Sequence, residues 1–249
     1  MSWMDALNLP KSCLIQKRIP LKKLAEHCTL KQKQLIEQTI SSVTLVALID
    51  EETSRVRAYV DAYENYQAFF ILEITSKRFP LGSEVYGLLH GMFPNPTILY
   101  SVQEDKIQLS SALKRISLNN SDQTIVEEVY ISPTLTISEE LINYISQINY
   151  QRVKVANLKE YYSKYSQIIQ LSQIIEDMNQ YPSINVDVEL LQKLVEDIKS
   201  IQVSIKSNEE EYRKEKSLSR RMDLHMQIIR DKKQLEVLQK QTMEVLCQS

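Results

Sequence analysis

The chain has 249 residues, of which 43% are hydrophobic and 25% are charged, and its formal net charge is −2. This composition is typical of a folded globular protein, and it excludes a disordered chain or one whose net charge alone selects a polyanionic partner. No apolar run approaches the roughly 20 residues that span a bilayer. The three cysteines are too far apart in the sequence for a zinc site. We expect a cytoplasmic protein that holds no metal and no cofactor.

The first 150 residues contain short apolar runs separated by turn-forming residues. Thr29 and Gln32 have the spacing of a capping box, which predicts that a helix begins near Leu30. Apolar runs of about seven residues predict buried strands, and apolar residues at intervals of three and four predict helices. The predicted elements are a helix from Leu30 that ends before Ser42, a hairpin of strands 43–49 and 56–63, a strand 68–75, a helix 85–92, strands 97–102, 107–113 and 125–131, and a helix from Ser138 to Ile148.

From Arg152 onward the pattern is helical. One helix is predicted to end at Asn179, and Tyr181-Pro182 then separates it from a second. The second helix is predicted to begin at Asp187, and it reaches the end of the chain without a glycine or a further proline. Unbroken, it would be roughly 90 Å long at about 1.5 Å per residue.

Apolar residues recur along this terminal segment at alternating intervals of three and four, which predicts a stripe that packs against another helix. The preceding helix can cover the stripe only as far as Ile205. Beyond that point we expect the segment to self-associate, to bind another protein, or to fold back at a bend near Asn208. The predicted partner-binding residues are Tyr212, Met222, Met226, Ile229, Leu235 and Leu238.

Together these elements predict an α+β fold with two domains. Residues 1–150 should form an antiparallel or mixed sheet with two or three helices. Residues 151–249 should form a helical hairpin that continues into a coiled coil. Because the long helix carries no residue pattern typical of catalysis, an adaptor role is favoured over an enzymatic one.

Basic residues are concentrated near the N-terminus, where seven lysines and arginines between Lys11 and Lys33 face the single acid Glu26. Each basic side chain that replaces a counterion on a phosphate adds affinity without sequence preference. A solvated helix face would carry similar charges. The predicted nucleic-acid contacts are Lys17, Arg18, Lys22 and Lys23.

An alternative from another class is a metal-dependent nuclease, in which carboxylates hold Mg²⁺ and a lysine stabilises developing charge. The candidate residues are Asp50, Asp61, Glu73 and Lys77. In a strand, Glu73 and Lys77 would lie about 13 Å apart, which disfavours a shared metal ion. A structural homodimer is a third interpretation.

Five strings along the chain share the pattern of one known family. They are RIP at 18–20, EITSK at 73–77, FPNPTILY at 93–100, ALKR at 112–115 and EKSLSRRMDLHMQIIRDKKQLEVL at 215–238. This pattern resembles a bacterial domain-of-unknown-function family, number forty-three ninety-one. The chain departs from the family at Ser217-Leu218-Ser219, where Q-F-N is usual, and at Ala112-Leu113, where A-Y is usual.

The resemblance implies a biological context rather than a reaction. Members of this family are often encoded beside superfamily-two helicases and DNA methyltransferases in phage-defence clusters. We therefore expect a non-enzymatic accessory or adaptor subunit of a bacterial DNA-processing or phage-defence assembly. The expected partner is a helicase or methyltransferase subunit, or a second copy of the chain, bound through the C-terminal coiled coil.

Overall fold

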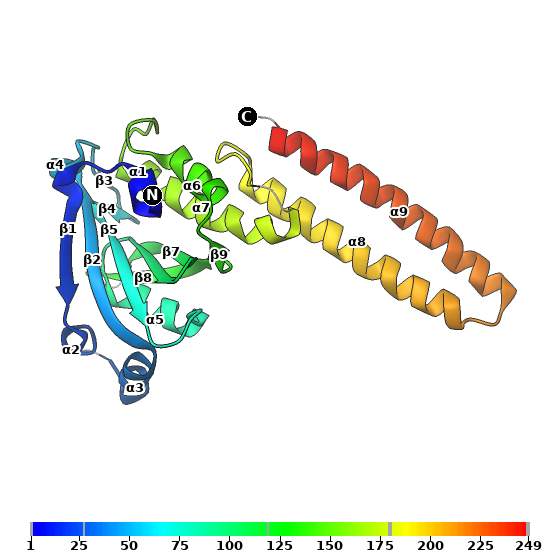
Figure 1. Cartoon of the computed structure of the whole chain (residues 1–249), viewed down its shortest axis with the longest axis horizontal. Coiled ribbons are helices and arrows are strands. Elements are labelled where there is room, and N and C mark those ends of the chain that lie inside the picture. The colour runs from blue at the N-terminus through cyan, green and yellow to red at the C-terminus, as the bar shows by residue number, and fades with distance from the viewer. Residues whose placement is uncertain (1, 27, 119, 179–180, 248–249) are drawn as a thin grey trace. The chain divides into compact units, whose positions relative to one another are not determined.

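The computed structural model describes the chain except for residues 1, 27, 119, 179–180 and 248–249, and its elements are drawn in Figure 1. It divides into two compact units, residues 1–173 and residues 174–249. The fold is α+β, as predicted from the sequence. The described helices are α1 Trp3–Leu7, α2 Leu21–Leu24, α3 Leu30–Thr39, α4 Glu51–Ser54, α5 Ser83–Met92, α6 Glu139–Ile145, α7 Leu158–Met178, α8 Val188–Lys214 and α9 Leu218–Cys247, with 3-10 turns at Lys11–Cys13 and Ser146–Ile148.

A mixed sheet forms the centre of the first unit. Its strand order is β1-β2-β5-β6-β7-β8, and the short strand β9 pairs with β7. Neighbouring strands are antiparallel except for β5 and β6, which are parallel and are connected through α5. The strands are β1 Leu14–Ile19, β2 Ile40–Asp50, β5 Ala68–Ser76, β6 Thr97–Gln103, β7 Lys106–Ser117, β8 Asn120–Ile131 and β9 Leu135–Thr136, and β3 Tyr59–Val60 pairs separately with β4 Asn65–Tyr66.

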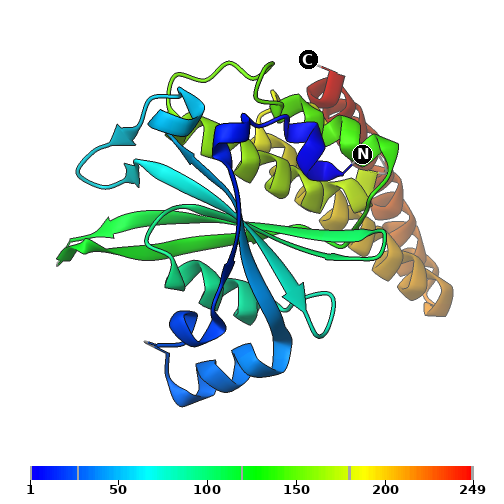
Figure 2. The same ribbon diagram turned by 60° about the vertical axis from the view of Figure 1, so that its left-hand side comes forward.

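Helices α3 and α5 lie on one face of the sheet (Figure 2). The predicted capping box is confirmed, because the backbone N–H of Gln32 donates to the Thr29 hydroxyl and the backbone N–H of Thr29 donates to the Gln32 side chain. The apolar face of α5 packs with alternate residues of β2, β5 and β6. This core contains Ile36, Ile40, Val43, Leu72, Ile74, Leu81, Val85, Tyr86, Leu89, Phe93 and Leu99.

Helix α7 lies on the opposite face of the sheet (Figure 2), where aromatic side chains form the core. The ring of Phe69 packs against three tyrosines of α7 at centroid distances of 5.6 to 5.8 Å. One of them, Tyr162, is buried, and its hydroxyl accepts a hydrogen bond of 3.1 Å from the backbone N–H of Ala112. Its own proton can be donated to the carbonyl oxygen of Ala112 or of Thr97. The position of α7 on β6 and β7 is therefore fixed by hydrogen bonds as well as by packing.

The hairpin predicted from strands 43–49 and 56–63 is wrong. β2 pairs instead with β1 on one side and with β5 on the other. The reason lies at the end of β2, where Asp50 accepts a hydrogen bond of 2.7 Å from the backbone N–H of Thr53 and caps the one-turn helix α4. Arg55 then ends α4 in the left-handed conformation, with φ of 60°.

In the second unit, α8 and α9 lie side by side and run in opposite directions (Figure 1). This hairpin turns at residues 215–217, and it is distinct from the hairpin predicted at Tyr181-Pro182, which would join α7 to α8. From the sequence, the distal segment is expected to self-associate, to bind another protein or to fold back near Asn208. In the structure it folds back, and the turn begins seven residues beyond Asn208. The Glu215 carboxylate accepts hydrogen bonds of 2.8 Å from the backbone N–H groups of Lys216 and Ser217, which stabilises a turn without glycine or proline.

The seam of this hairpin alternates intervals of three and four residues on both helices. Asp231 occupies a buried position in the middle of the seam, where its carboxylate accepts hydrogen bonds from the Ser204 hydroxyl at 3.0 Å and the Gln227 amide at 2.7 Å. A buried polar residue in a helix seam specifies the register of pairing. The seam residues are Leu191, Leu194, Ile198, Ile201, Ile205, Asn208 and Tyr212 on α8, and Leu224, Ile228, Asp231, Leu235, Leu238, Thr242 and Val245 on α9.

Candidate functional site

The four predicted nucleic-acid contacts lie on the surface of the first unit. Lys17 and Arg18 are on β1, which is an edge strand, and Lys22 and Lys23 are on α2. All four side chains are exposed. Within the described part of the chain none of them forms an ion pair. These charges are therefore available to a polyanion.

The four residues of the nuclease alternative have separate local partners. Asp50 caps α4 and lies opposite Ala68 on β5, five residues from Glu73, which corresponds to roughly 16 Å along the strand. Lys77 caps the C-terminal end of α3, because its ammonium group donates to the carbonyl oxygen of Glu37. Its backbone N–H donates to Thr39. The structure therefore does not bring Asp50 and Glu73 together.

Asp61 lies in the turn between β3 and β4. Its carboxylate accepts hydrogen bonds from the Tyr59 hydroxyl at 2.7 Å and from the backbone N–H groups of Tyr63 and Glu64 at 2.8 and 2.7 Å. The hydrogen bond from Tyr59, followed by the two backbone bonds, lowers the pKa of Asp61. Among the described residues, no group of three or more histidines, cysteines, aspartates or glutamates has a geometry that could hold a metal ion.

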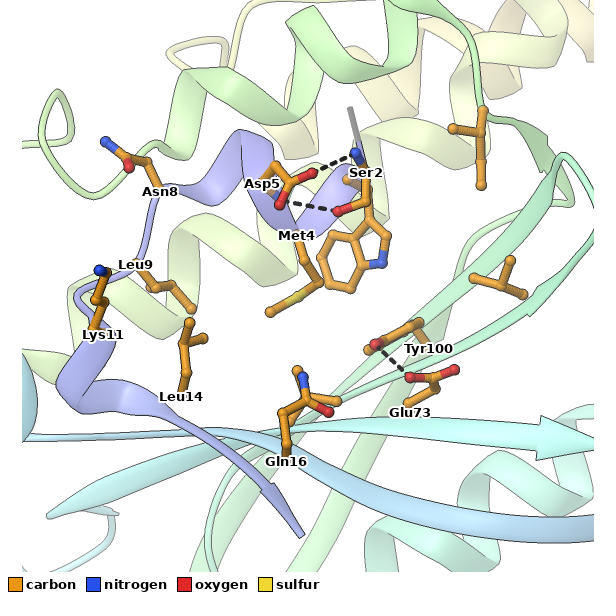
Figure 3. A pocket seen from close by; sticks show the side chains of 14 residues that line it. Ser2, Met4, Asp5, Asn8, Leu9, Lys11, Leu14, Gln16, Glu73 and Tyr100 are labelled. Carbon is orange, nitrogen blue, oxygen red and sulfur yellow. Dashed lines mark hydrogen bonds between the residues drawn. The ribbon is translucent and has the colours of Figure 1, made fainter. Parts of the chain in front are cut away.

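Glu73 lines a cavity of about 740 Å³ that lies between the sheet and the segment preceding β1 (Figure 3). Tyr100 of β6 is directly opposite Glu73 of β5 in the parallel register, and its hydroxyl donates a hydrogen bond of 3.0 Å to the Glu73 carboxylate. Burial and the neighbouring carboxylate raise the pKa of Tyr100. The hydroxyl therefore keeps its proton and holds the carboxylate in place.

Helix α1 forms the roof of this cavity (Figure 3). Ser2 and Asp5 form a capping box that starts the helix, and Trp3 packs edge-on against Tyr100 at a centroid distance of 4.7 Å. The other end of α1 is held by Asn149, whose amide donates a hydrogen bond of 3.0 Å to the carbonyl oxygen of Ala6. The cavity therefore has a fixed roof and a fixed floor.

A buried polar cluster lies beneath α5. The ring of His90 is 2.9 Å from the hydroxyl of Ser110, and both side chains are 0% exposed, so the pair is closed to any substrate. Burial lowers the pKa of His90 to about 3. Lys114 donates hydrogen bonds of 2.6 and 2.8 Å to the carbonyl oxygens of Phe93 and Asn95 beyond the end of α5. The two hydrogen bonds of Lys114 hold the segment that follows α5 against β7.

The predicted partner-binding residues divide into two sets. Tyr212, Leu235 and Leu238 lie in the seam between α8 and α9, where they are partly buried. Met222 and Met226 are 64% and 49% exposed and lie outside the seam. The heptad pattern did not separate these sets. It predicted that Met222, Met226 and Ile229 face the partner helix, whereas the seam of α9 contains Leu224, Ile228 and Asp231, which lie on another face of the helix.

Ile229 is 37% exposed and also lies outside the seam. Together with Leu218, which the sequence did not single out, these residues form a surface that we call the α9 row: Leu218, Met222, Met226 and Ile229. Successive members are four, four and three residues apart, so at about 100° per residue they share one face of the helix, turned away from the seam. Beside this row is a groove of about 210 Å³, lined by Tyr212, Arg221, His225 and three members of the row. The guanidinium of Arg221 lies 4.8 Å from the centroid of the Tyr212 ring.

Sequence reasoning missed the cavity because it assigned no structure before residue 18. One signal was present, since Ser2 and Asp5 have the spacing of a helix start. Tyr100 carried no signal, because its pairing with Glu73 depends on which strands are neighbours. The register between β5 and β6 is visible only in the folded chain.

No curated protein and no solved structure shows a significant match to this sequence. Within the described residues, no helix is both long enough and apolar enough to cross a membrane. A family model described as Domain of unknown function (DUF4391) matches residues 7–235, a range that includes Glu73, Tyr100 and the whole α9 row. The chain therefore belongs to the DUF4391 family, as its sequence motifs predicted.

Proposed function

We propose that this protein is a non-enzymatic accessory subunit that binds a partner protein through the α9 row. The observation that carries the proposal is the exposure of four large apolar side chains on one face of α9. The hairpin does not need them, because its own seam uses other residues. Methionines are flexible and polarisable, and they are common on surfaces that bind helices. An amphipathic helix laid along the row would bury these side chains.

The charges around the α9 row define the chemistry of the partner. Among the exposed side chains between residues 221 and 233, the basic ones outnumber the single acid Asp223, because Asp231 is buried in the seam. Complementary charges favour association and fix orientation. We therefore assign as partner a protein helix whose apolar face is flanked by acidic residues. The basic residues are Arg221, Arg230 and Lys233, whereas Lys232 is already paired with Glu209 of α8 at 2.8 Å.

We further propose that the partner is a helicase or methyltransferase subunit of a bacterial DNA-processing or phage-defence assembly in the cytoplasm. Family membership supports this proposal through the genes that the resemblance places beside members of the family. The basic N-terminal residues support it because they could lie near DNA in such an assembly. This support comes from the genes found beside members of the family and not from the chemistry of a site.

The double variant Met222→Glu/Met226→Glu should lower affinity for the partner at least about 100-fold, because it places two like charges on the apolar face that the partner buries. The intact protein would be titrated with the purified helicase or methyltransferase subunit by calorimetry. Val203→Glu is a matched control, since Val203 is an exposed apolar residue of α8 outside the row. It should leave the affinity unchanged.

The same experiment separates a partner from a second copy of the chain. A structural homodimer would have twice the chain mass of 29.0 kDa, and the double variant would convert it to a monomer in sedimentation. The proposal requires that the wild-type protein bind the enzyme subunit and that the double variant lose that binding. Equal affinity of the wild type and the double variant would overturn it.

We propose that Lys17, Arg18, Lys22 and Lys23 contact DNA phosphates without sequence preference. Replacing all four by glutamine should weaken duplex binding in a fluorescence polarisation titration and should reduce the slope of log affinity against log salt by roughly three to four. Replacing Lys206, Lys214, Lys216 and Lys240 of the second unit in the same way is the matched control. An unchanged salt slope in the first variant would contradict the proposed contacts.

A further inference from the structure

We infer that the cavity beneath α1 binds a small organic cation, namely an ammonium, amidinium or guanidinium group carried on an apolar or aromatic body. This inference does not rest on the proposed partner-binding function. It rests on the carboxylate of Glu73, the aromatic rings of Trp3 and Tyr100, and the volume of the cavity that they line. Figure 3 shows Glu73 and Tyr100 in this lining.

The charged residues that line the cavity are Asp5, Glu73 and Lys11, so the lining carries a net negative charge. The carboxylate of Glu73 selects the charge of the ligand. One of its oxygens accepts the Tyr100 hydrogen bond, and the other has no hydrogen-bond or ion-pair partner among the described residues. The carboxylate of Asp5, which also lines the cavity, already accepts a hydrogen bond of 2.7 Å from the backbone N–H of Ser2. A half-buried carboxylate with a free oxygen is stabilised by a cationic donor.

The surroundings of Glu73 select the body of the ligand. Trp3 and Tyr100 bring two aromatic rings to the cavity, and such rings attract a cation electrostatically as well as an apolar surface. Met4, Leu9 and Val102 add aliphatic lining. A volume of about 740 Å³ lies within the range of pockets that bind drug-sized molecules.

The chain contains a natural reporter for this cavity. Trp3 is its single tryptophan, and this residue lines the cavity and is 4% exposed. Fluorescence excited at the red edge of the indole band therefore reports on this cavity alone.

The probes are three compounds of nearly the same shape: benzamidine carries a positive charge, benzamide is neutral and benzoate carries a negative charge.

Benzamidine should change the Trp3 emission of the intact protein saturably, with an affinity at least about tenfold higher than that of benzamide, and benzoate should not bind. Glu73→Gln should reduce the affinity for benzamidine at least about tenfold, because glutamine can still accept from Tyr100 but carries no charge. Glu52→Gln, at an exposed position of α4, is the matched control and should bind like the wild type.

Equal affinities for the three probes on the wild-type protein would overturn the inference without any variant. Undiminished benzamidine binding by a folded Glu73→Gln protein would also overturn it.

A second experiment uses an acetylated and amidated Gly-Arg-Gly peptide, which presents a guanidinium group on a peptide backbone. Tighter binding of that peptide than of benzamidine would overturn the assignment to a small molecule.

Discussion

Replacing Lys114 by methionine should lower the free energy of unfolding by roughly 2–4 kcal/mol at pH 8.5 and by less at pH 6. The buried amino group of Lys114 donates to the carbonyl oxygens of Phe93 and Asn95, which lose these partners in the variant. Methionine fills a similar volume, so the loss reports on hydrogen bonding rather than on a cavity.

The pH dependence follows from the pKa of Lys114, which burial lowers from 10.5 to about 7. Because the folded-state pKa lies below the unfolded one, the unfolded chain binds more protons between these values, and stability rises with pH. Between pH 6 and 8.5 the expected gain from Lys114 is about 2 kcal/mol. His90 adds about 1 kcal/mol in the same range, because burial lowers its folded-state pKa to about 3 while the unfolded chain still binds a proton up to the ordinary value of 6.5.

Urea unfolding followed by Trp3 fluorescence measures this effect in the first unit, where the tryptophan lies. Lys106→Met is the matched control, because Lys106 is an exposed lysine on the same strand β7. It should retain the rise in stability with pH. The account of Lys114 would be contradicted if Lys114→Met showed the same rise as the wild type.

The substitution Ile228→Asp should destabilise the hairpin of α8 and α9 by roughly 3–5 kcal/mol. Ile228 is 6% exposed in the seam, three residues from the buried carboxylate of Asp231. A second carboxylate there would lose apolar packing and add repulsion between like charges. Far-UV circular dichroism should show lost helix, and proteolysis should cut between residues 188 and 247.

The neighbouring residue supplies a control of the same type. Ile229 is 37% exposed and belongs to the α9 row, so Ile229→Asp should keep the hairpin folded and weaken partner binding. Both variants should keep the urea transition that Trp3 reports. If Ile229→Asp unfolded the hairpin as readily as Ile228→Asp, the assignment of seam and row would be wrong.

Local signals predicted much of the fold. The run 43–49 became β2, the run 68–75 became β5, and the Asp187 cap starts α8 at the expected place. These segments have apolar patterns and caps that are set by residues within a few positions of one another. Their boundaries therefore follow from the sequence itself.

The errors arose where distant residues decide the outcome. Strand β1 is exposed along most of its length and has no apolar pattern, so only its pairing with β2 makes it a strand. The turn at 215–217 has no breaker residue and depends on the Glu215 carboxylate and on the seam that closes behind it. The same seam decides that Leu235 is partly buried while Met222 is exposed.

The central claim is that the α9 row binds a helix of another protein, and site-specific photo-crosslinking in intact cells tests it most directly. A photoreactive residue at Met222 should give one adduct, which maps to a helix of a helicase or methyltransferase subunit with acidic residues beside its apolar face. The same residue at Lys206, exposed on α8, should give none. An adduct confined to a second copy of this chain, or equal adducts from both positions, would contradict the claim.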